Sequence, residues 1–148
     1  MASDPVHYLS MTDVSERLRR RELKATALCE MILARIAQRD GALKSYTTLL
    51  ADRAMNKARQ AEEELNRGLW RGLLHGVPIG LKDLYLTKGV RTTGGSRILA
   101  DWTPDEDATV VTRLAEAGAI VVGKLNMHEF AFGPEGLNPH YGTAWNPW

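Results

Sequence analysis

The sequence predicts an α/β fold in which helices lead into the first strands of a sheet. Residues 1–67 hold one of the thirteen glycines and residues 68–148 hold twelve, so a glycine-poor part precedes a turn-rich part. Apolar residues recur at helical spacing in the first part. The second part contains two short apolar runs typical of buried strands. We therefore expect one domain with a helical lead-in over residues 1–68 and an α/β segment over residues 69–148.

Three helices are predicted in the first part. Thr12 is the expected N-cap of the first helix, which places Val14 and Leu18 on one face. The second helix is expected to end before Asp40-Gly41. The third is expected to close at Gly68. The buried positions predicted for the second and third helices are Leu28, Ile32 and Ile36, and then Ala51, Ala54, Ala58, Ala61 and Leu65.

A strand, a helix and a second strand are predicted in the second part. The first strand covers residues 77–81, although Pro78 argues against a central position in a sheet. An acidic stretch at residues 105–107 leads into a helix that ends near Gly118. The apolar run at residues 119–123 follows as a strand. This order favours a parallel crossover unit.

Composition excludes several classes of protein. Nineteen basic and eighteen acidic side chains leave a net charge of +1, which indicates neither a nucleic-acid binder nor a membrane-surface protein. A single cysteine excludes an internal disulfide and fits a reducing compartment. The sequence contains neither an apolar run long enough for a membrane span nor a recognisable secretion signal. We expect a cytoplasmic globular protein.

Lys82 is the sharpest candidate for chemistry. It lies where the predicted strand at residues 77–81 runs out into a turn, which is the position where open α/β sheets meet ligands. A lysine that loses its hydration there becomes a neutral base. The alternative is a lysine that reaches water or pairs with Asp83. The nearby segment 92–96, Thr-Thr-Gly-Gly-Ser, either presents N–H groups and hydroxyls to a ligand or is simply a tight turn with positive φ angles.

Other motifs are weaker. Residues 118–124 match the P-loop spacing, but the residues between the glycine and the lysine read as a strand, and Leu125 replaces the hydroxyl residue that holds Mg²⁺. His128 and Glu129 have no second histidine pair at zinc spacing, so no metal site is expected. The basic residues of segment 17–24 are interpreted as a solvated helix face, with RNA contact as the alternative. Cys29 is expected to be a small core residue.

Taken together, five blocks of the second part resemble the amidase signature family of Ser–Ser–Lys hydrolases. Leu125, where the family commonly has threonine, is a small departure from that pattern. The resemblance implies a mixed α/β amidase signature fold, hydrolysis of linear C–N amide bonds, and no metal or organic cofactor. The matching blocks are residues 74–83, 92–96, 107–111 together with 114–119, 123–131 and 142–147.

The resemblance also implies roles for single residues. Lys82 matches the family's catalytic lysine, which deprotonates a serine held by a cis peptide bond; that serine activates the nucleophilic serine. Thr93, Gly95 and Ser96 match the segment that packs beside the lysine. Asn126, Met127 and Phe132 match a stretch near the acyl pocket.

Neither family serine is present in its expected segment. The serines of the chain are Ser3, Ser10, Ser15, Ser45 and Ser96. We therefore interpret residues 1–148 as an N-terminal portion of an amidase signature domain and expect them to be inactive alone, and either poorly stable or oligomeric, with a homodimer as one candidate.

The expected ligand is a small amide. A family alternative is the amidotransferase A polypeptide that frees ammonia from glutamine for a mischarged tRNA, which would need partner subunits. Alternatives from other classes are a non-catalytic interaction protein derived from the family and a nucleotide binder.

Overall fold

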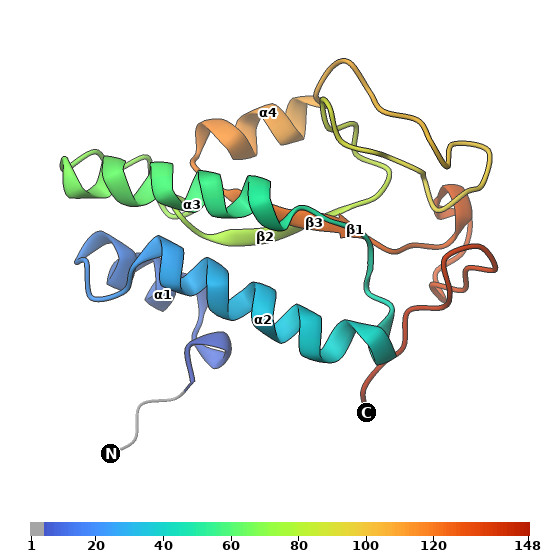
Figure 1. The fold of residues 1–148 in the computed structure, drawn as a ribbon, viewed down its shortest axis with the longest axis horizontal. Coiled ribbons are helices and arrows are strands. Elements are labelled where there is room, and N and C mark those ends of the chain that lie inside the picture. Colours follow the sequence, from blue (N-terminus) through green and yellow to red (C-terminus); the bar gives the residue numbers. More distant parts are fainter. Residues whose placement is uncertain (1–4) are drawn as a thin grey trace. The chain divides into compact units, whose positions relative to one another are not determined.

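The computed structural model describes residues 5–148 and confirms the predicted α/β class (Figure 1). Within that range, none of the helices is both long and apolar enough to cross a membrane. The helices and strands are, in chain order, η1 (Val6–Tyr8), α1 (Met11–Arg19), α2 (Ala25–Leu43), β1 (Tyr46–Leu49), α3 (Ala51–Asn66), β2 (Pro78–Lys82), α4 (Thr109–Glu116), β3 (Ile120–Leu125) and η2 (Glu129–Ala131).

The three strands form one sheet in the order β1-β3-β2. β1 pairs antiparallel with β3, with Leu49 opposite Gly123. β2 runs parallel to β3, because the Ile120 N–H donates to the Val77 carbonyl near one end and the Asp83 N–H donates to the Leu125 carbonyl near the other. The parallel crossover through α4 is therefore confirmed, and proline-containing β2 lies at an edge of this sheet. Strand β1 was not predicted.

Two predicted helix ends are wrong by a few residues. Ser10 caps α1 in place of Thr12, since the Asp13 N–H donates to the Ser10 Oγ at 3.1 Å. Helix α2 does not stop before Asp40 but continues to Leu43, and the Asp40 carboxylate then accepts the Ser45 N–H at 2.6 Å. Lys44, the residue after the helix, has a φ of 54°, and Gly41 is an ordinary helical residue.

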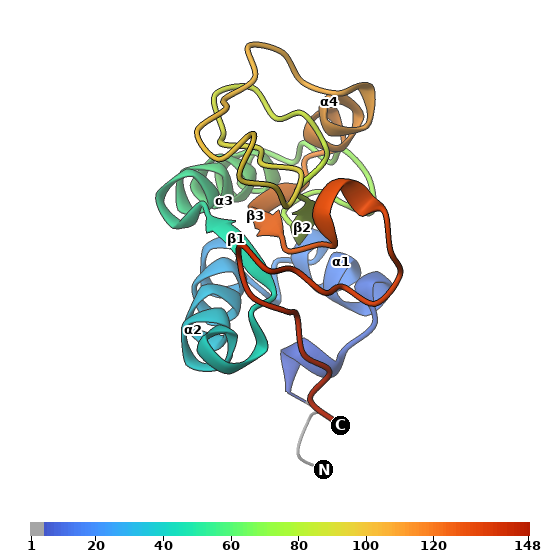
Figure 2. The ribbon, with the colours of Figure 1, turned by 90° about the vertical axis from the view of Figure 1, so that its right-hand side faces the viewer.

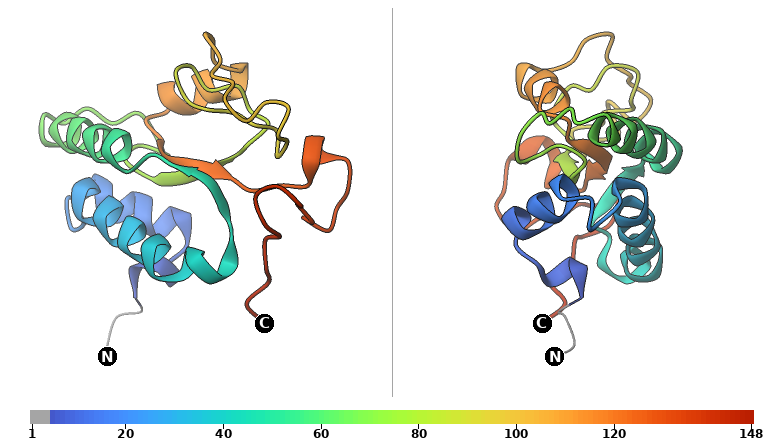
Figure 3. Two further views of the ribbon diagram at one scale, coloured as in Figure 1. Left: turned by 45° about the vertical axis from the view of Figure 1, so that its right-hand side comes forward. Right: turned by 90° about the vertical axis from the view of Figure 1, so that its left-hand side faces the viewer.

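The chain divides into two compact units that are interleaved in sequence. Among the described residues, the first comprises residues 5–35, 50–79 and 114–122; the second comprises residues 36–49, 80–113 and 123–148. The core of the first unit joins α1, the first half of α2, α3 and the start of β2 (Figure 3). The buried residues of this core are Val14, Leu18, Ala25, Leu28, Ala61, Leu65 and Val77.

Helix patterning accounts for this core. Ala54, Ala58, Ala61 and Leu65 form the buried stripe predicted for α3, whereas Ala51 is exposed. Gly68 follows α3 with a φ of 81° and donates its N–H to the Leu65 carbonyl, as expected for the residue that closes a helix. Cys29 is fully buried in α2, and burial raises the pKa of its thiol to about 11, which confirms a core role.

A polar cluster in the first unit joins α3 to the segment before β2. The Arg71 guanidinium donates two hydrogen bonds of 2.7 Å to the Glu64 carboxylate. His75 is fully buried; its Nδ1 accepts the Arg71 N–H, and its Nε2 lies 3.1 Å from a Glu64 oxygen. The hydrogen bonds from Arg71 are the main reason that the pKa of Glu64 falls from 4.5 to about 2.

Glu64→Gln is therefore expected to cost about 1–2 kcal/mol of stability at pH 7, after allowance for solvent screening at a partly exposed pair. A carboxyl whose pKa is lower in the folded state contributes stability above its unfolded pKa and loses it as the pH falls through its folded pKa. For Glu64 this window runs from about 4.5 to about 2. Urea midpoints of the full-length gene product at pH 7, 5, 4 and 3 should converge between wild type and Glu64→Gln as the pH falls. Exposed Glu63→Gln is the matched control, and an equal gap at every pH would contradict the expectation.

Candidate active site

The candidate site lies in the second unit, where the chain leaves β2 and β3 (Figure 2). Lys82 is the last residue of β2 and is exposed, whereas the next residue, Asp83, is fully buried. Successive side chains of a strand point to opposite faces, which explains the difference. Within residues 5–148 the Lys82 side chain is exposed to solvent and is therefore not desolvated, unlike the lysine that the sequence predicted.

Asp83 is held from several directions. Its N–H donates to the Leu125 carbonyl and its own carbonyl accepts the Gly94 N–H, both at 3.0 Å. One carboxylate oxygen, Oδ2, accepts the Thr93 hydroxyl at 2.5 Å, the Thr47 hydroxyl at 2.9 Å and the Thr93 N–H at 3.3 Å. The other oxygen, Oδ1, faces a lysine.

That lysine is Lys124 of β3, not the adjacent Lys82. Its Nζ lies 3.4 Å from Asp83 Oδ1, and it donates to the Thr92 Oγ1 at 2.7 Å and to the Tyr85 carbonyl at 2.8 Å. Both side chains of this ion pair have no exposed surface. Burial lowers the pKa of Lys124, and the Asp83 carboxylate opposes that shift. Sequence reasoning missed this role, although a lysine inside a buried apolar run was a usable signal.

Segment 92–96 is the tight turn that one of the two interpretations predicted. Gly94 and Gly95 have φ angles of 60° and 72°. Its hydroxyls face inward: Thr93 is fully buried and its Oγ1 also accepts the Gly95 N–H at 3.0 Å. A Cβ atom at Gly95 would lie 2.9 Å from the Asn138 Nδ2 and from the Met127 carbonyl, so this position has no room for a side chain. The turn is packed against the segment that follows β3.

Ser96 ends this turn and binds a second polar group. Its hydroxyl donates to the Glu129 carboxylate at 2.5 Å, and the same carboxylate oxygen lies 3.1 Å from the His140 Nε2. The Ser96 hydrogen bond, followed by the charge of His140, lowers the pKa of Glu129. Ser96 is fully buried, so its hydroxyl acts as a link between loops and not as an exposed nucleophile.

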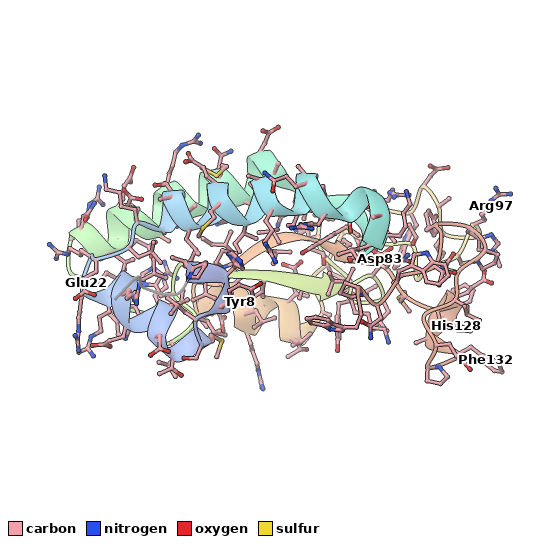
Figure 4. The ribbon with its side chains drawn as sticks, turned by 90° about the horizontal axis from the view of Figure 1, so that it is seen from below. Tyr8, Glu22, Asp83, Arg97, His128 and Phe132 are labelled. Carbon is pink, nitrogen blue, oxygen red and sulfur yellow. The ribbon has the colours of Figure 1, made fainter. Side chains whose placement is uncertain are left out.

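The three residues expected near an acyl pocket lie in different surroundings. The Asn126 amide donates to the carbonyls of Lys44 and Gly142, so it fastens two loops together. Met127 is buried, and its carbonyl accepts the Asn138 amide at 2.7 Å. Phe132 is 93% exposed and points outward in Figure 4, in contrast to Asp83, which is fully buried just beyond the end of β2.

Two weaker motifs are also accounted for. Residues 120–124 belong to β3 and Lys124 is buried in the ion pair, so the P-loop spacing at residues 118–124 is a strand, as the sequence predicted. In the part of the chain that the structure describes, no group of three or more histidine, cysteine, aspartate or glutamate side chains is arranged to hold a metal ion.

Comparison with known proteins shows the family of this chain. The profile of the family described as Amidase matches residues 27–148. The chain belongs to the amidase signature family. Among its sequence relatives, the glutamyl-tRNA(Gln) amidotransferase A polypeptide of Moorella thermoacetica is 45% identical over 143 residues, and the putative amidase AmiD of Mycobacterium bovis is 42% identical over 145 residues.

Solved amidase signature structures share the fold. The peptide amidase of Stenotrophomonas maltophilia superposes with a TM-score of 0.88 at 34% identity, over 97% of this chain and 31% of that one. A bacterial aryl acylamidase of the same family gives a TM-score of 0.89 at 26% identity, over 97% and 30% of the two chains. The sequence relatives show the same proportion: the match takes in 97% of this chain but 29% of the Moorella protein, and 98% of this chain but 30% of the Mycobacterium protein.

Proposed function

We propose that the full-length gene product hydrolyses C–N amide bonds and that residues 1–148 supply its catalytic base, Lys82. The observation that carries the proposal is the position of Lys82 within a family-matched segment. Lys82 is the last residue of β2, and its side chain is exposed and free to reach a partner. The next residue, Asp83, is fixed by hydrogen bonds to Leu125 of β3 and to the turn at residues 92–96. Family membership supports the reaction class.

In the proposed reaction the neutral Lys82 amine accepts a proton from the hydroxyl of one serine. That serine in turn accepts the proton of the nucleophilic serine. The nucleophile adds to the amide carbonyl, the amine or ammonia leaves with a proton, and water then releases the acid from the acyl-enzyme. Ser96 is buried against Glu129 and is not proposed for either role. Both serines are proposed to lie outside residues 1–148, as the family resemblance implies. The water exclusion that a neutral lysine requires would come from the same remainder of the protein.

The first substrate class that we propose is a small linear amide. The second is glutamine, with partner subunits and a mischarged tRNA, because several relatives above 40% identity are amidotransferase A polypeptides. The net charge of +1 fits a small-molecule substrate and gives no sign of tRNA contact by residues 1–148 themselves. A cytoplasmic location is proposed with either substrate and is supported by the buried, unpaired Cys29.

We further propose that residues 1–148 expressed alone are inactive and associate with themselves, for example as a homodimer. Large apolar side chains of the second unit are open to solvent, among them Ile98, Phe132 and Trp145. Such a surface favours association when no other part of the protein packs against it. A non-catalytic interaction protein derived from the family would show this association but no activity in the full-length product.

Ammonia release by the purified full-length gene product tests the proposal. The panel contains glutamine, a C-terminal peptide amide and an aryl acylamide, the last assayed by amine release. We expect saturable turnover of at least one of them by the full-length product and none by residues 1–148 alone. Turnover by residues 1–148 that disappears in Lys82→Ala would contradict the division of the active site. A full-length product that is inactive on every amide, and on glutamine also when partner subunits and the mischarged tRNA are added, would contradict the hydrolase.

A further inference from the structure

The ion pair next to Lys82 has several polar partners, although Asp83 Oδ1 accepts no hydrogen bond and lies 3.4 Å from the Lys124 Nζ. Lys124 has three partners for its ammonium group, namely Asp83 Oδ1, Thr92 Oγ1 and the Tyr85 carbonyl. Asp83 receives three hydrogen bonds on Oδ2 from Thr93 and Thr47. The two side chains are fully buried.

Stability alone is a poor reason for such a pair. Removing two charges from water costs several kcal/mol for each ion, and apolar side chains of similar volume often replace a buried pair without loss of stability. An apolar pair, however, cannot orient the hydrogen-bonding groups that surround it. The Asp83–Lys124 pair orients groups from β1, β3 and the turn at residues 92–96 around a single carboxylate.

The pair also fixes the backbone next to Lys82. The Asp83 N–H and carbonyl are bound to Leu125 and Gly94, and the side chain is bound as described, so the peptide unit that joins Lys82 to Asp83 has little freedom to rotate. Strand alternation then turns the Lys82 side chain to the opposite face. The fixed backbone thus sets the direction in which the Lys82 side chain leaves β2, which limits the region that its amine can reach.

We propose that the buried Asp83–Lys124 pair is the positioning element of Lys82, setting the direction of the proposed base through the backbone of β2. This inference rests on the proposed function of Lys82. Asp83 and Lys124 are positioning residues and do not touch the substrate.

The test uses four variants of the full-length gene product and one matched control, assayed with the amide of the panel that the wild type hydrolyses best. Asp83→Asn is expected to lower kcat about 100-fold and Thr47→Val about 10-fold, each with KM within about twofold of wild type, because the base and not the binding surface moves. Thr93→Val should resemble Thr47→Val, and Thr93→Ser, which keeps the hydroxyl, should recover activity to within about threefold of wild type.

Thr48→Val is the matched control for Thr47→Val. The two threonines are adjacent in β1 and both half-buried, but the Thr48 hydroxyl contacts Arg91 and not Asp83. We expect Thr48→Val to keep kcat within about twofold of wild type. Thermal midpoints are measured for each variant, and Thr47→Val and Thr93→Ser remain informative even if Asp83→Asn does not fold.

A second readout does not depend on amide hydrolysis. Brief acetylation with acetic anhydride, read by mass spectrometry, compares Lys82 with exposed Lys57 of α3 as an internal reference. If the pair sets the direction of the Lys82 side chain, its relative acetylation rate should change at least threefold in Asp83→Asn or Thr47→Val.

The outcomes separate the two proposals. Wild-type activity that persists in a Lys82 substitution would remove the proposed role of Lys82. Wild-type activity that depends on Lys82 but is unchanged in Thr47→Val and Thr93→Val would overturn the positioning role alone. Equal acetylation of Lys82 in wild type and Thr47→Val would overturn it irrespective of activity.

Discussion

Replacement of Lys82 by methionine is expected to lower kcat/KM for amide hydrolysis by the full-length gene product at least about 1000-fold. Methionine keeps the length and the flexible stem of the side chain but removes the only group that can accept the serine proton. In residues 5–148 the Lys82 side chain is exposed at the end of β2, so its loss leaves no cavity in this part of the fold. The thermal midpoint should therefore stay close to that of the wild type.

Lys88→Met is the matched control, because Lys88 is another exposed lysine in the segment that follows β2. It should retain activity within about twofold. Steady-state kinetics and intact-protein mass spectrometry for acyl-enzyme accumulation measure both steps. A loss below about tenfold in Lys82→Met would assign the base to another residue, and accumulation of acyl-enzyme in that variant would restrict Lys82 to the second half of the reaction.

How far the site could be predicted depended on how local its geometry is. The turn at residues 92–96 is encoded by adjacent glycines that tolerate positive φ, so its shape could be predicted from the sequence. The Asp83–Lys124 pair could not, since it joins residues far apart in sequence that meet only because β2 and β3 pair in parallel. From sequence alone, Lys82 was the nearer partner for Asp83, yet strand alternation separates them.

The fold shows the same distinction. Helix α3 and the β2–α4–β3 crossover followed from apolar spacing and from terminal glycines. Strand β1 is short, and its residues are half-buried or exposed, so it carries no alternating pattern; its place in the sheet is set by pairing with β3. At the end of α2 the positive φ falls on Lys44 and the Ser45 N–H donates to Asp40, neither of which a glycine-based rule includes.

The largest stability effect is expected at Gly118, which follows α4 with a φ of 81°. A Cβ atom there would lie 2.6 Å from the His75 Cδ2 and 3.1 Å from the His75 Cα. His75 cannot withdraw, because it is fully buried and its Nδ1 accepts the Arg71 N–H. Gly118→Ala should therefore lower the free energy of unfolding by about 3 kcal/mol, from backbone strain and overpacking together.

Gly68→Ala separates these two contributions. Gly68 has the same φ of 81° but no heavy atom within 4 Å of an added Cβ, so its substitution should cost only about 1 kcal/mol of backbone strain. Urea unfolding of the full-length gene product, followed by fluorescence, measures both; Trp70, whose ring centroid is 5.9 Å from that of His75, reports on the site. In a His75→Ala background, the cost of Gly118→Ala should fall toward that of Gly68→Ala. Equal costs for the two glycines in the wild-type background would mean that His75 moves aside, and that the cluster of Glu64, Arg71 and His75 is less rigid than its hydrogen bonds indicate.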